Sequence, residues 1–418
     1  MARVLADRII TSIDIGTTKI SVLIAQQLDG KRVEILGIGK APSYGLRKGV
    51  VVDVADTIRS IKTAVQEAEL MAGIQVESAY IGISGAHISS MNSQGMIPLK
   101  YGQVRPYDIK QVIETAKAIP VSEGQKILHV LPQYFIIDDQ DPVYNPCNLH
   151  GVRLQVQAHI IMGSVSCVQN LITCCEAAGI SVKDIVLEQL ASADAVLSND
   201  EKELGVAMID IGGGTADLAL YQRGNIRHTM VLPVAGQHFT NDLAIGMRIS
   251  RAEAERIKKE YGCVISPFDT ALARVNKNNE EIIVESIDVA DTQHINQYDI
   301  ARVLYPRANE LLAIVRREII QKKLQKFMTA GLVLTGGGSL LNGMKELAQE
   351  IFDVPVRIGI PRIEYDLPQS LESPIYATGY GLLIHVLKKY ADNRINNIDG
   401  PLVQRIFMQM KSWVSDFF

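Results

Sequence analysis

Two segments of the chain join an aspartate to a turn of small residues, a combination suited to holding phosphate. The segments read "IDIGTTK" and "IDIGGGT", and their aspartates are Asp14 and Asp210. Glycine permits the close approach and the positive φ angles with which backbone N–H groups converge on an anion. An acid that faces the same anion makes chemical sense only with a divalent cation between them, and Mg²⁺ keeps most of its waters. We therefore expect Asp14 and Asp210 to hold Mg²⁺ through water, from opposite walls of a cleft.

Residues beside these turns add donors for phosphate oxygens. Thr17, Thr18 and Thr215 carry hydroxyls, and Lys19 adds a positive charge. A third glycine loop, from Gly336 to Ser339, follows an apolar strand and is expected to start a helix, where a base or a phosphate can rest on bare backbone. A single loop of this kind is more often an ordinary tight turn. The recurrence of the aspartate at the same place favours phosphate binding.

The elements that must position these turns are repeated along the chain. Residues 9–39 predict three strands, and the second half repeats the order of strand, loop, strand, turn and strand. Asp14 and Asp210 are 196 positions apart, a period that indicates two homologous domains and not a solenoid. Between them, residues 84–162 change to short strands and polar turns around one helix, which we interpret as an inserted subdomain.

A helix is expected after the first three strands. Asp53 or Asp56 is the predicted N-cap, and Gly73 marks the end of the helix.

Length and composition place the chain among globular proteins of several domains. Its 418 residues allow roughly two to three domains, and a net charge of −4 gives no support to a broad nucleic-acid surface. The five cysteines include no C-x-x-C pair, so neither a disulfide framework nor a zinc site is expected. No signal-peptide pattern is found, and no apolar run approaches the roughly 18 residues that cross a bilayer. We expect a reduced, cytoplasmic protein with no nucleic-acid partner.

The order of these motifs resembles the actin-like ATPases, a superfamily that includes actin, sugar kinases, heat-shock chaperone ATPases and MreB. The segments that carry the resemblance are "IDIGTTKI", "LEQLASADAVL", "MIDIGGGTADLAL", "LVLTGGGSLLNG" and "YATGYGLL", which look like phosphate, connecting and adenosine motifs. The inserted piece "LPQYFIIDDQDPVYNPCNLHGVRLQVQAHII" and the terminal helix resemble the FtsA family of bacterial division proteins. The resemblance covers nearly the whole chain. It implies an α/β fold of the actin-like, ribonuclease-H-like type, duplicated into two lobes around a nucleotide cleft, with an inserted small α/β subdomain.

This fold implies a division of the chain into lobes and subdomains. The expected parts are a first nucleotide-binding lobe at 1–83, completed by about 163–195 and 378–390; the inserted subdomain at 84–162; a second lobe at 196–246, completed by about 326–377; a small subdomain at 247–325; a flexible linker at 391–400; and an amphipathic membrane-targeting helix at 401–418.

The resemblance also implies roles for single residues in binding ATP or ADP with Mg²⁺. Glu188, at the head of the first connecting helix, matches an acid near the metal-bound or attacking water, and we expect at most weak ATPase activity. Glu255 and Lys258 match a ribose-contacting pair of the MreB-like branch, although a solvated helix face would account for them equally. His238 is interpreted as a packing or hydrogen-bonded residue. The expected nucleotide-binding residues are Asp14, Gly16, Thr17, Thr18, Lys19, Asp210, Gly212, Gly213, Gly214, Thr215, Asp217, Gly236, Glu255, Lys258, Gly336, Gly337, Gly338 and Ser339.

The last residues of the chain predict a helix with one apolar face. The apolar positions follow a helical period, the polar stretch before them separates the helix from the folded body, and the single tryptophan suits a membrane interface. A terminal helix docked on the protein's own core is the commoner alternative for such a stripe. The residues expected at the membrane are Leu402, Val403, Ile406, Phe407, Met410, Trp413, Val414, Phe417 and Phe418, with Arg405 and Lys411 beside them.

For the FtsA-like reading, the resemblance implies an ATP-binding, filament-forming protein on the cytoplasmic face of the inner membrane at the division site. It implies four partners: the FtsZ C-terminal peptide, other copies of this chain, later division proteins bound through the inserted subdomain, and anionic membrane lipid. Residues 247–325 are expected to receive FtsZ. A type IV pilus adaptor of the same fold is the nearest alternative, and a small-molecule kinase is a further one.

Overall fold

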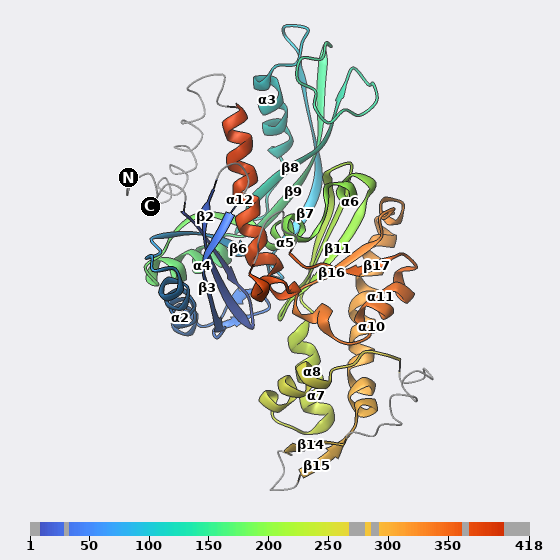
Figure 1. Ribbon diagram of the computed structural model, residues 1–418. Coiled ribbons are helices and arrows are strands. Elements are labelled where there is room, and N and C mark those ends of the chain that lie inside the picture. The colour runs from blue at the N-terminus through green and yellow to red at the C-terminus, as the bar shows by residue number, and fades with distance from the viewer. Residues whose placement is uncertain (1–8, 29–32, 267–280, 286–291, 362–367, 397–418) are drawn as a thin grey trace.

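The computed structural model describes residues 9–28, 33–266, 281–285, 292–361 and 368–396. Two large sheets stand side by side, with a third sheet at one end of the molecule and a mainly helical region at the other (Figure 1). The predicted membrane-targeting helix, 401–418, lies outside the described residues. Among the helices that the structure describes, none is long and apolar enough to cross a membrane.

The first sheet carries Asp14 and includes the three strands predicted at the start of the chain, which are confirmed. In spatial order its strands are β10 (Ser181–Leu187), β6 (Ser78–Ile83), β1 (Ile9–Ile15), β2 (Lys19–Gln27) and β3 (Val33–Pro42). The pairs β1–β2 and β2–β3 are antiparallel, whereas β1–β6 and β6–β10 are parallel. A short antiparallel pair, β4 (Leu46–Arg47) and β5 (Val50–Val51), follows β3.

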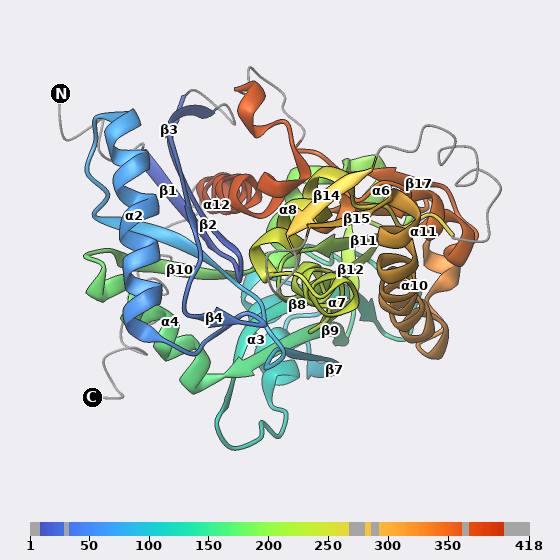
Figure 2. The same ribbon diagram turned by 90° about the horizontal axis from the view of Figure 1, so that it is seen from below.

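Helices cover both faces of this sheet. Successive side chains of β2 point to opposite sides, and both sides are buried. Ile24 lies in one core cluster with Ile61, and Leu23 lies in another with Leu190. The helices are α2 (Val54–Ala72) and α4 (Val165–Ala177) on one face, and α5 (Glu188–Val196) and α12 (Ala377–Asn396) on the other. Figure 2 shows α2 and α12 on opposite sides of this sheet.

The ends of α2 follow local chemistry. The Asp53 side chain accepts a hydrogen bond from the Asp56 backbone N–H, so Asp53, and not Asp56, is the N-cap. Gly73 ends the helix in the left-handed region, with φ of 66°.

The linker predicted over 391–400 is wrong over its first six residues. α12 continues to Asn396, and only 397–400 lie outside the described residues. Extending an existing helix adds one hydrogen bond for each residue that it orders, so a polar stretch without glycine or proline can continue it. Polar composition alone did not indicate this.

The second sheet carries Asp210 and repeats the plan of the first. In spatial order its strands are β13 (Asn225–Leu232), β12 (Ala216–Gln222), β11 (Val206–Ile211), β16 (Leu332–Thr335) and β17 (Val356–Ile358). Helices α6 (Asn199–Leu204), α7 (Gly236–Met247) and α11 (Met344–Phe352) belong to the same half. Short 3₁₀ turns occur at Gln325–Phe327, Gly337–Leu340, Gln369–Leu371 and Pro374–Tyr376.

The two aspartate hairpins match in register. Asp14 of β1 pairs with Ser21 of β2, and Asp210 of β11 pairs with Asp217 of β12. Each aspartate is the next-to-last residue of its strand, and each turn is closed by the same bond, from a glycine N–H to the carbonyl three residues on. This agreement in backbone geometry confirms the internal repeat that the sequence predicted.

A mainly helical region extends from the second sheet. It contains α8 (Arg251–Tyr261), the long helix α10 (Gln297–Gln321) and an antiparallel pair, β14 (Ile282–Glu285) and β15 (Thr292–Ile295). The region is seen at the bottom of Figure 1, away from the third sheet.

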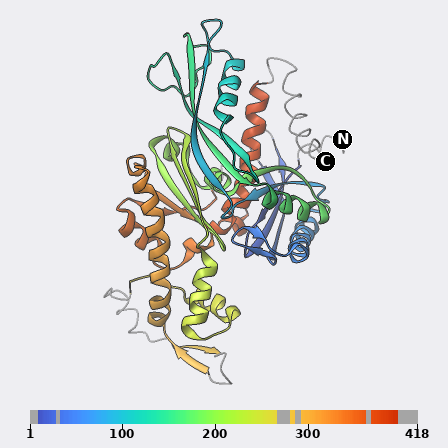
Figure 3. The same cartoon turned by 180° about the vertical axis from the view of Figure 1, so that it is seen from behind.

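The third sheet is built by the predicted insertion. Its strands, in spatial order, are β7 (Ser89–Pro98), β9 (Arg153–Ser164) and β8 (Gln125–Ile137), with α3 (Pro106–Lys117) packed on them (Figure 3). The expectation of short strands is wrong. Pro132 lies inside β8 at a register shift, so the N–H that proline lacks falls where the ladder is already irregular.

The third sheet caps the edge strand β13 of the second sheet. Ser90 donates to the carbonyl of Thr229 at 2.9 Å, and Gln133 donates to the carbonyls of Ile226 and Arg227 at 3.0 Å each. The ring of His159, which is 1% exposed, bonds through Nε2 to the Thr229 hydroxyl at 2.8 Å. The inserted strands therefore satisfy the outer edge of a sheet that belongs to the other half of the chain.

We expect acid to weaken this interface through His159. Burial, with a smaller effect from His228, lowers the pKa of His159 from 6.5 to about 3. An unfolded chain binds the proton near pH 6.5 and the folded ring binds it only near pH 3, so lowering the pH through this window favours unfolding. As the pH falls from about 7 to about 5, the free energy of unfolding should decrease by about 2 kcal/mol because of this residue. Urea titrations at both pH values should show a smaller loss for His159→Gln; equal losses would contradict the assignment.

Candidate functional site

The two aspartate hairpins face each other and their turns touch. A Cβ atom added to Gly213 would lie 2.3 Å from the Thr18 hydroxyl oxygen, and one added to Gly214 would lie 2.2 Å from that of Thr17. Any side chain at either glycine would therefore displace the facing threonine. The turns at Gly16–Thr18 and Gly212–Thr215, predicted from sequence to lie on opposite walls of one cleft, are brought together.

Four carboxylic acids surround this meeting point. Asp14, Asp210 and Asp217 are 7%, 6% and 3% exposed. Burial raises the pKa of Asp14, which Lys19 opposes, and burial also raises the pKa of Asp210. Burial and the charge of Asp210 raise the pKa of Asp217 to about 7. Glu188 is held well above its usual pKa by burial and by the other three acids.

Lys19 is a cation close enough to lower the pKa of Asp14, Asp210 and Glu188. Its ammonium lies 3.8 Å from Asp14 and donates to the carbonyl of Ile375 at 2.5 Å. Burial lowers the pKa of Lys19 itself. One such charge does not balance the four acids when they are ionised, so a further cation would favour their charged forms.

That cation would be held through water and not by direct bonds to a cluster of acids. Within the described ranges, no group of three or more histidines, cysteines, aspartates or glutamates is arranged to hold a metal ion. Mg²⁺ commonly uses one or two carboxylates and fills its remaining positions with water and phosphate oxygens. The two carboxylates of Asp14 and Asp210 fit this mode of binding. Their role in holding Mg²⁺ stays a prediction.

Glu188 is the first residue of α5 and lies against the first sheet. A Cβ atom on Gly82 of β6 would be 3.1 Å from its Cγ, so the carboxylate side chain passes close to bare backbone. Its raised pKa suits a group that accepts or returns a proton. The catalytic role that the sequence predicted for Glu188 remains a prediction.

Three hydroxyl residues that the sequence analysis missed hold the acids of the second hairpin. Ser192 of α5 donates to Asp210 Oδ2 at 2.6 Å, and the Thr378 hydroxyl of α12 lies 3.2 Å from the same atom. Ser84, just after β6, donates to Asp217 Oδ1 at 2.7 Å. Ser192 and Thr378 lie inside the segments quoted as connecting and adenosine motifs, but no spacing rule points to their hydroxyls.

The third glycine loop lies beside Asp210, but it does not begin a helix. Gly336 has φ of 77°, and residues Gly337–Leu340 form a 3₁₀ turn before α11 begins at Met344. The expectation that an α-helix starts in this loop is therefore wrong, because the α-helix begins only at Met344. Ser339 is buried, and its hydroxyl donates to the carbonyl of Gly336 at 2.7 Å, which closes the turn.

Glu255 and Lys258 form an ion pair on α8 beside the second hairpin, and not a solvated face. Lys258 Nζ lies 2.6 Å from Glu255, 2.9 Å from the Thr240 hydroxyl and 3.2 Å from the carbonyl of Gly236. The Gly236 N–H in turn donates to the carbonyl of Gly212 at 3.0 Å. The pair is thus connected to the phosphate turn, although its contact with ribose stays a prediction.

His238, set aside as a hydrogen-bonded residue, accepts a bond from the Ala235 N–H through Nδ1 at 3.2 Å, near the start of α7.

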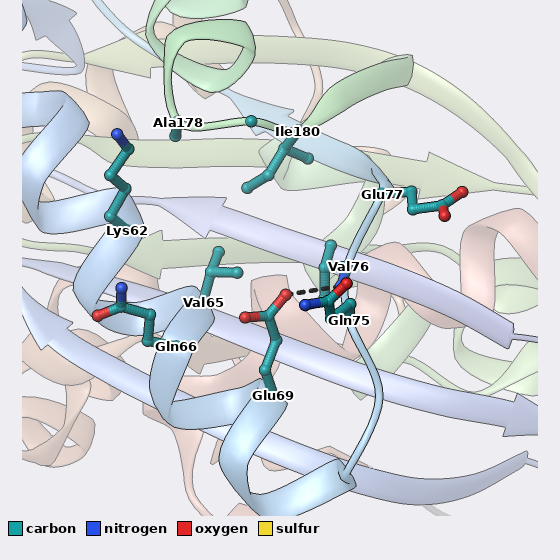
Figure 4. Close-up of a pocket in the computed structure, with 10 residues that line it drawn as sticks. Lys62, Val65, Gln66, Glu69, Gln75, Val76, Glu77, Ala178 and Ile180 are labelled. Atoms are coloured by element: carbon teal, nitrogen blue, oxygen red, sulfur yellow. Dashed lines mark hydrogen bonds between the residues drawn. The ribbon is translucent and has the colours of Figure 1, made fainter.

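A separate cavity lies on the outer face of the first sheet, between α2 and the turn that leads into β10 (Figure 4). Its volume is about 460 Å³, and its wall includes Lys62, Val65, Glu69 and Ile180. The Glu69 carboxylate accepts a bond from the Val76 N–H at 2.7 Å across it. Neither the four acids of the cleft nor its three glycine turns line this cavity, so it is distinct from the cleft.

Comparison with known proteins gives both a family and a fold. Two family models match the chain: "Cell division protein FtsA" over residues 207–381, and "SHS2 domain inserted in FTSA" over residues 85–162. Cell division protein FtsA of Pseudomonas aeruginosa is 40% identical, over 100% of both chains. The FtsA of Escherichia coli is 35% identical over 97% of this chain and 96% of its own, and that of Bacillus subtilis is 36% identical over 89% and 82%.

Two solved structures share the fold at low identity. A PilM–PilN type IV pilus biogenesis complex matches with a TM-score of 0.62 and 18% identity, over 90% of this chain and 98% of that chain. An MreB of Spiroplasma citri bound to ADP matches with a TM-score of 0.54 and 17% identity, over 93% and 99%. These likenesses confirm the predicted actin-like α/β fold, and the SHS2 match confirms the inserted subdomain.

Proposed function

Because this chain belongs to the FtsA family of cell division proteins, we propose that it binds ATP with Mg²⁺ between its two aspartate hairpins and acts in division as a filament-forming membrane adaptor. The observation that carries the nucleotide part is the meeting of the two hairpins, with four acids and one lysine around them. The turns touch in this structure, so a nucleotide would enter as Thr17 and Thr18 move away from Gly213 and Gly214. An MreB relative of the same fold binds ADP, which supports the choice of ligand.

Each residue of the cleft would have a distinct task. Asp14 and Asp210 would accept hydrogen bonds from the waters of Mg²⁺, and the backbone of the two glycine turns would face the phosphates. Glu255 and Lys258 would lie at the ribose. Bound magnesium would neutralise phosphate charge. Phosphoryl transfer depends mainly on this charge stabilisation and on correct positioning of the reacting groups.

Hydrolysis would depend on Glu188. Its pKa, raised by burial and neighbouring acids, would let it orient a water and take its proton. Glu188 is the single candidate base, and Lys19 is the cation that acts on its pKa. We therefore propose ATP binding with slow or absent turnover.

Membrane attachment and recruitment complete the proposed role. The apolar stripe of 401–418 would bind anionic lipid weakly as a single helix, and a filament of many copies would add avidity. The region of α8 and α10 would receive the FtsZ C-terminal peptide, and the inserted subdomain would receive later division proteins. Arg307 of α10 is paired with Asp242 at 2.6 Å, so its charge is already partly satisfied within this region.

Two alternatives of the same fold have weaker support. A type IV pilus adaptor rests on the PilM–PilN likeness, which shows the fold alone. A small-molecule kinase would need an acid facing a bound hydroxyl. Asp210 and Asp217 are instead bonded to the protein's own hydroxyls, those of Ser192 and Ser84.

Reconstitution on vesicles tests the proposed function. We expect the full chain, with ATP and Mg²⁺, to carry fluorescent FtsZ onto vesicles that contain anionic lipid. Vesicles alone, and vesicles with an FtsZ that lacks its C-terminal peptide, are the matched controls. Recruitment that is equal with and without this protein would contradict the adaptor role.

A further inference from the structure

We propose that Ser192 and Thr378 are positioning residues that hold the Asp210 carboxylate in place for a metal-bound water. This inference rests on the proposed nucleotide function, and it assigns a task to two residues that the sequence motifs did not single out.

The three side chains form a hydrogen-bonded chain. Ser192 Oγ lies 2.6 Å from Asp210 Oδ2 and 3.0 Å from the Thr378 hydroxyl, while Thr378 lies 3.2 Å from the same carboxylate oxygen. Each hydroxyl has one proton to donate. The shorter distances therefore favour a relay in which Thr378 donates to Ser192 and Ser192 donates to Asp210, with each bond polarising the next. Ser192 is the principal contact and Thr378 the supporting one.

The other oxygen of Asp210 is left facing the third loop. A Cβ atom on Gly336 would lie 2.2 Å from Asp210 Oδ1, so this atom rests against bare backbone, and a side chain at Gly336 would displace it. Among the described residues, no hydrogen bond to Oδ1 is found that would compete with a water. One oxygen of the carboxylate is thus fixed by hydroxyls, and the other lies beside the third glycine loop with no hydrogen-bond partner among the described residues.

Asp14, the partner acid, is held much more loosely. The Ser21 hydroxyl is 3.4 Å from its Oδ2, and Lys19 is 3.8 Å away. A hydrogen bond to an ionised acceptor is strongest near 2.5–2.7 Å. The structure therefore makes Asp210 the preorganised acid of the pair and leaves Asp14 to adjust.

The close crossing of two helices brings the hydroxyls together. A Cβ atom on Gly381 of α12 would lie 1.9 Å from the carbonyl of Ala191, so glycine allows α12 to pack directly on α5. Ser192 is fully buried and Thr378 is 9% exposed. Bulk water therefore has little access to either hydroxyl and cannot easily replace the bond between them. Two hydroxyls buried at a helix crossing, both within reach of one carboxylate, are costly unless they stay bonded.

The first turn of α12 also contacts the first hairpin. The Ser12 hydroxyl of β1 donates to the carbonyl of Gly379 at 2.8 Å, one residue beyond Thr378. One helical turn thus touches the strands of both acids.

Magnesium titrations of nucleotide binding test the assignment. With a fluorescent ATP analogue at fixed concentration, Ser192→Ala should raise the half-saturating Mg²⁺ concentration by roughly tenfold, as loss of a partner of a metal-ligand group commonly does. Thr378→Val, which keeps the shape without the hydroxyl, should raise it by about threefold. Thr378→Ser is the matched control and should behave as the wild type. Binding of the analogue in EDTA should be the same in all four proteins.

The outcomes separate this inference from the function on which it rests. Equal magnesium requirements in wild type, Ser192→Ala and Thr378→Val would overturn the positioning role while leaving nucleotide binding intact. Failure of Thr378→Ser to restore the wild-type value would overturn it as well, because packing and not the hydroxyl would then matter. If the wild type shows no magnesium-dependent binding, the proposed function fails and this inference fails with it. Should Ser192→Ala not fold, the pair of Thr378 variants decides.

Discussion

Replacing Asp210 with alanine is expected to lower the affinity for ATP with Mg²⁺ by roughly 10- to 100-fold, the usual effect of losing a group that supports a metal through hydrogen bonds. The protein should remain folded. Burial raises the pKa of this carboxyl, so its charged form is already unfavourable in the empty cleft. Its removal leaves Ser192 and Thr378 at 3.0 Å, close enough to satisfy each other. Equilibrium binding of a fluorescent ATP analogue, with the midpoint of thermal unfolding beside it, measures both effects.

Asp210→Asn is the matched control for charge. The amide oxygen can still accept from Ser192, but it carries no negative charge for the waters of a cation. We expect Asp210→Asn to lose most of the magnesium dependence while keeping the wild-type midpoint of unfolding. A variant of either kind that binds as tightly as the wild type in magnesium would show that Asp210 does not face the cation.

Removal of residues 401–418 is expected to abolish flotation of the protein with vesicles that contain anionic lipid. The apolar positions of this segment follow one helix face and include the single tryptophan, whereas Arg405 and Lys411 lie off that face. The described remainder contains no helix that could cross a membrane, so the structure shows no spanning element that could replace it. Flotation of full-length and shortened protein, at matched concentration, gives the comparison.

A charge placed in the stripe is the sharper control, because it keeps the chain length. Trp413→Glu should weaken flotation strongly, whereas Gln404→Glu, off the apolar face, should weaken it only slightly. The ATP affinity of the shortened protein should match that of the full chain. If the shortened protein floats as well as the full one, lipid attachment lies elsewhere in the molecule.

The sequence predicted the two hairpins well because their signal is local. An aspartate before a small-residue turn, between two apolar runs, determines a strand, a turn and a strand over a few residues. Its recurrence then indicated the duplication, which the equal registers of Asp14 with Ser21 and Asp210 with Asp217 confirm. The identity of the family followed from the order of several such motifs.

Contacts between distant segments could not be predicted in the same way. Thr378 lies 168 positions from Asp210 along the chain, and Ser84 lies 133 from Asp217, so no period or spacing relates them. The Glu255–Lys258 pair was open to two interpretations because a helix face reveals its solvent exposure only after packing. The third loop was misassigned as the start of an α-helix because glycines after a strand fit either a helix start or a turn, and the α-helix begins only at Met344.

The affinity of the wild-type chain for ATP, measured by calorimetry once with Mg²⁺ and once with EDTA, tests the central claim most directly. If the twin aspartates hold a cation between them and the phosphates, ATP should bind clearly with magnesium and much more weakly without it, since no cation then separates the acids from the triphosphate. Equal affinity under the two conditions, or no binding under either, would contradict the account.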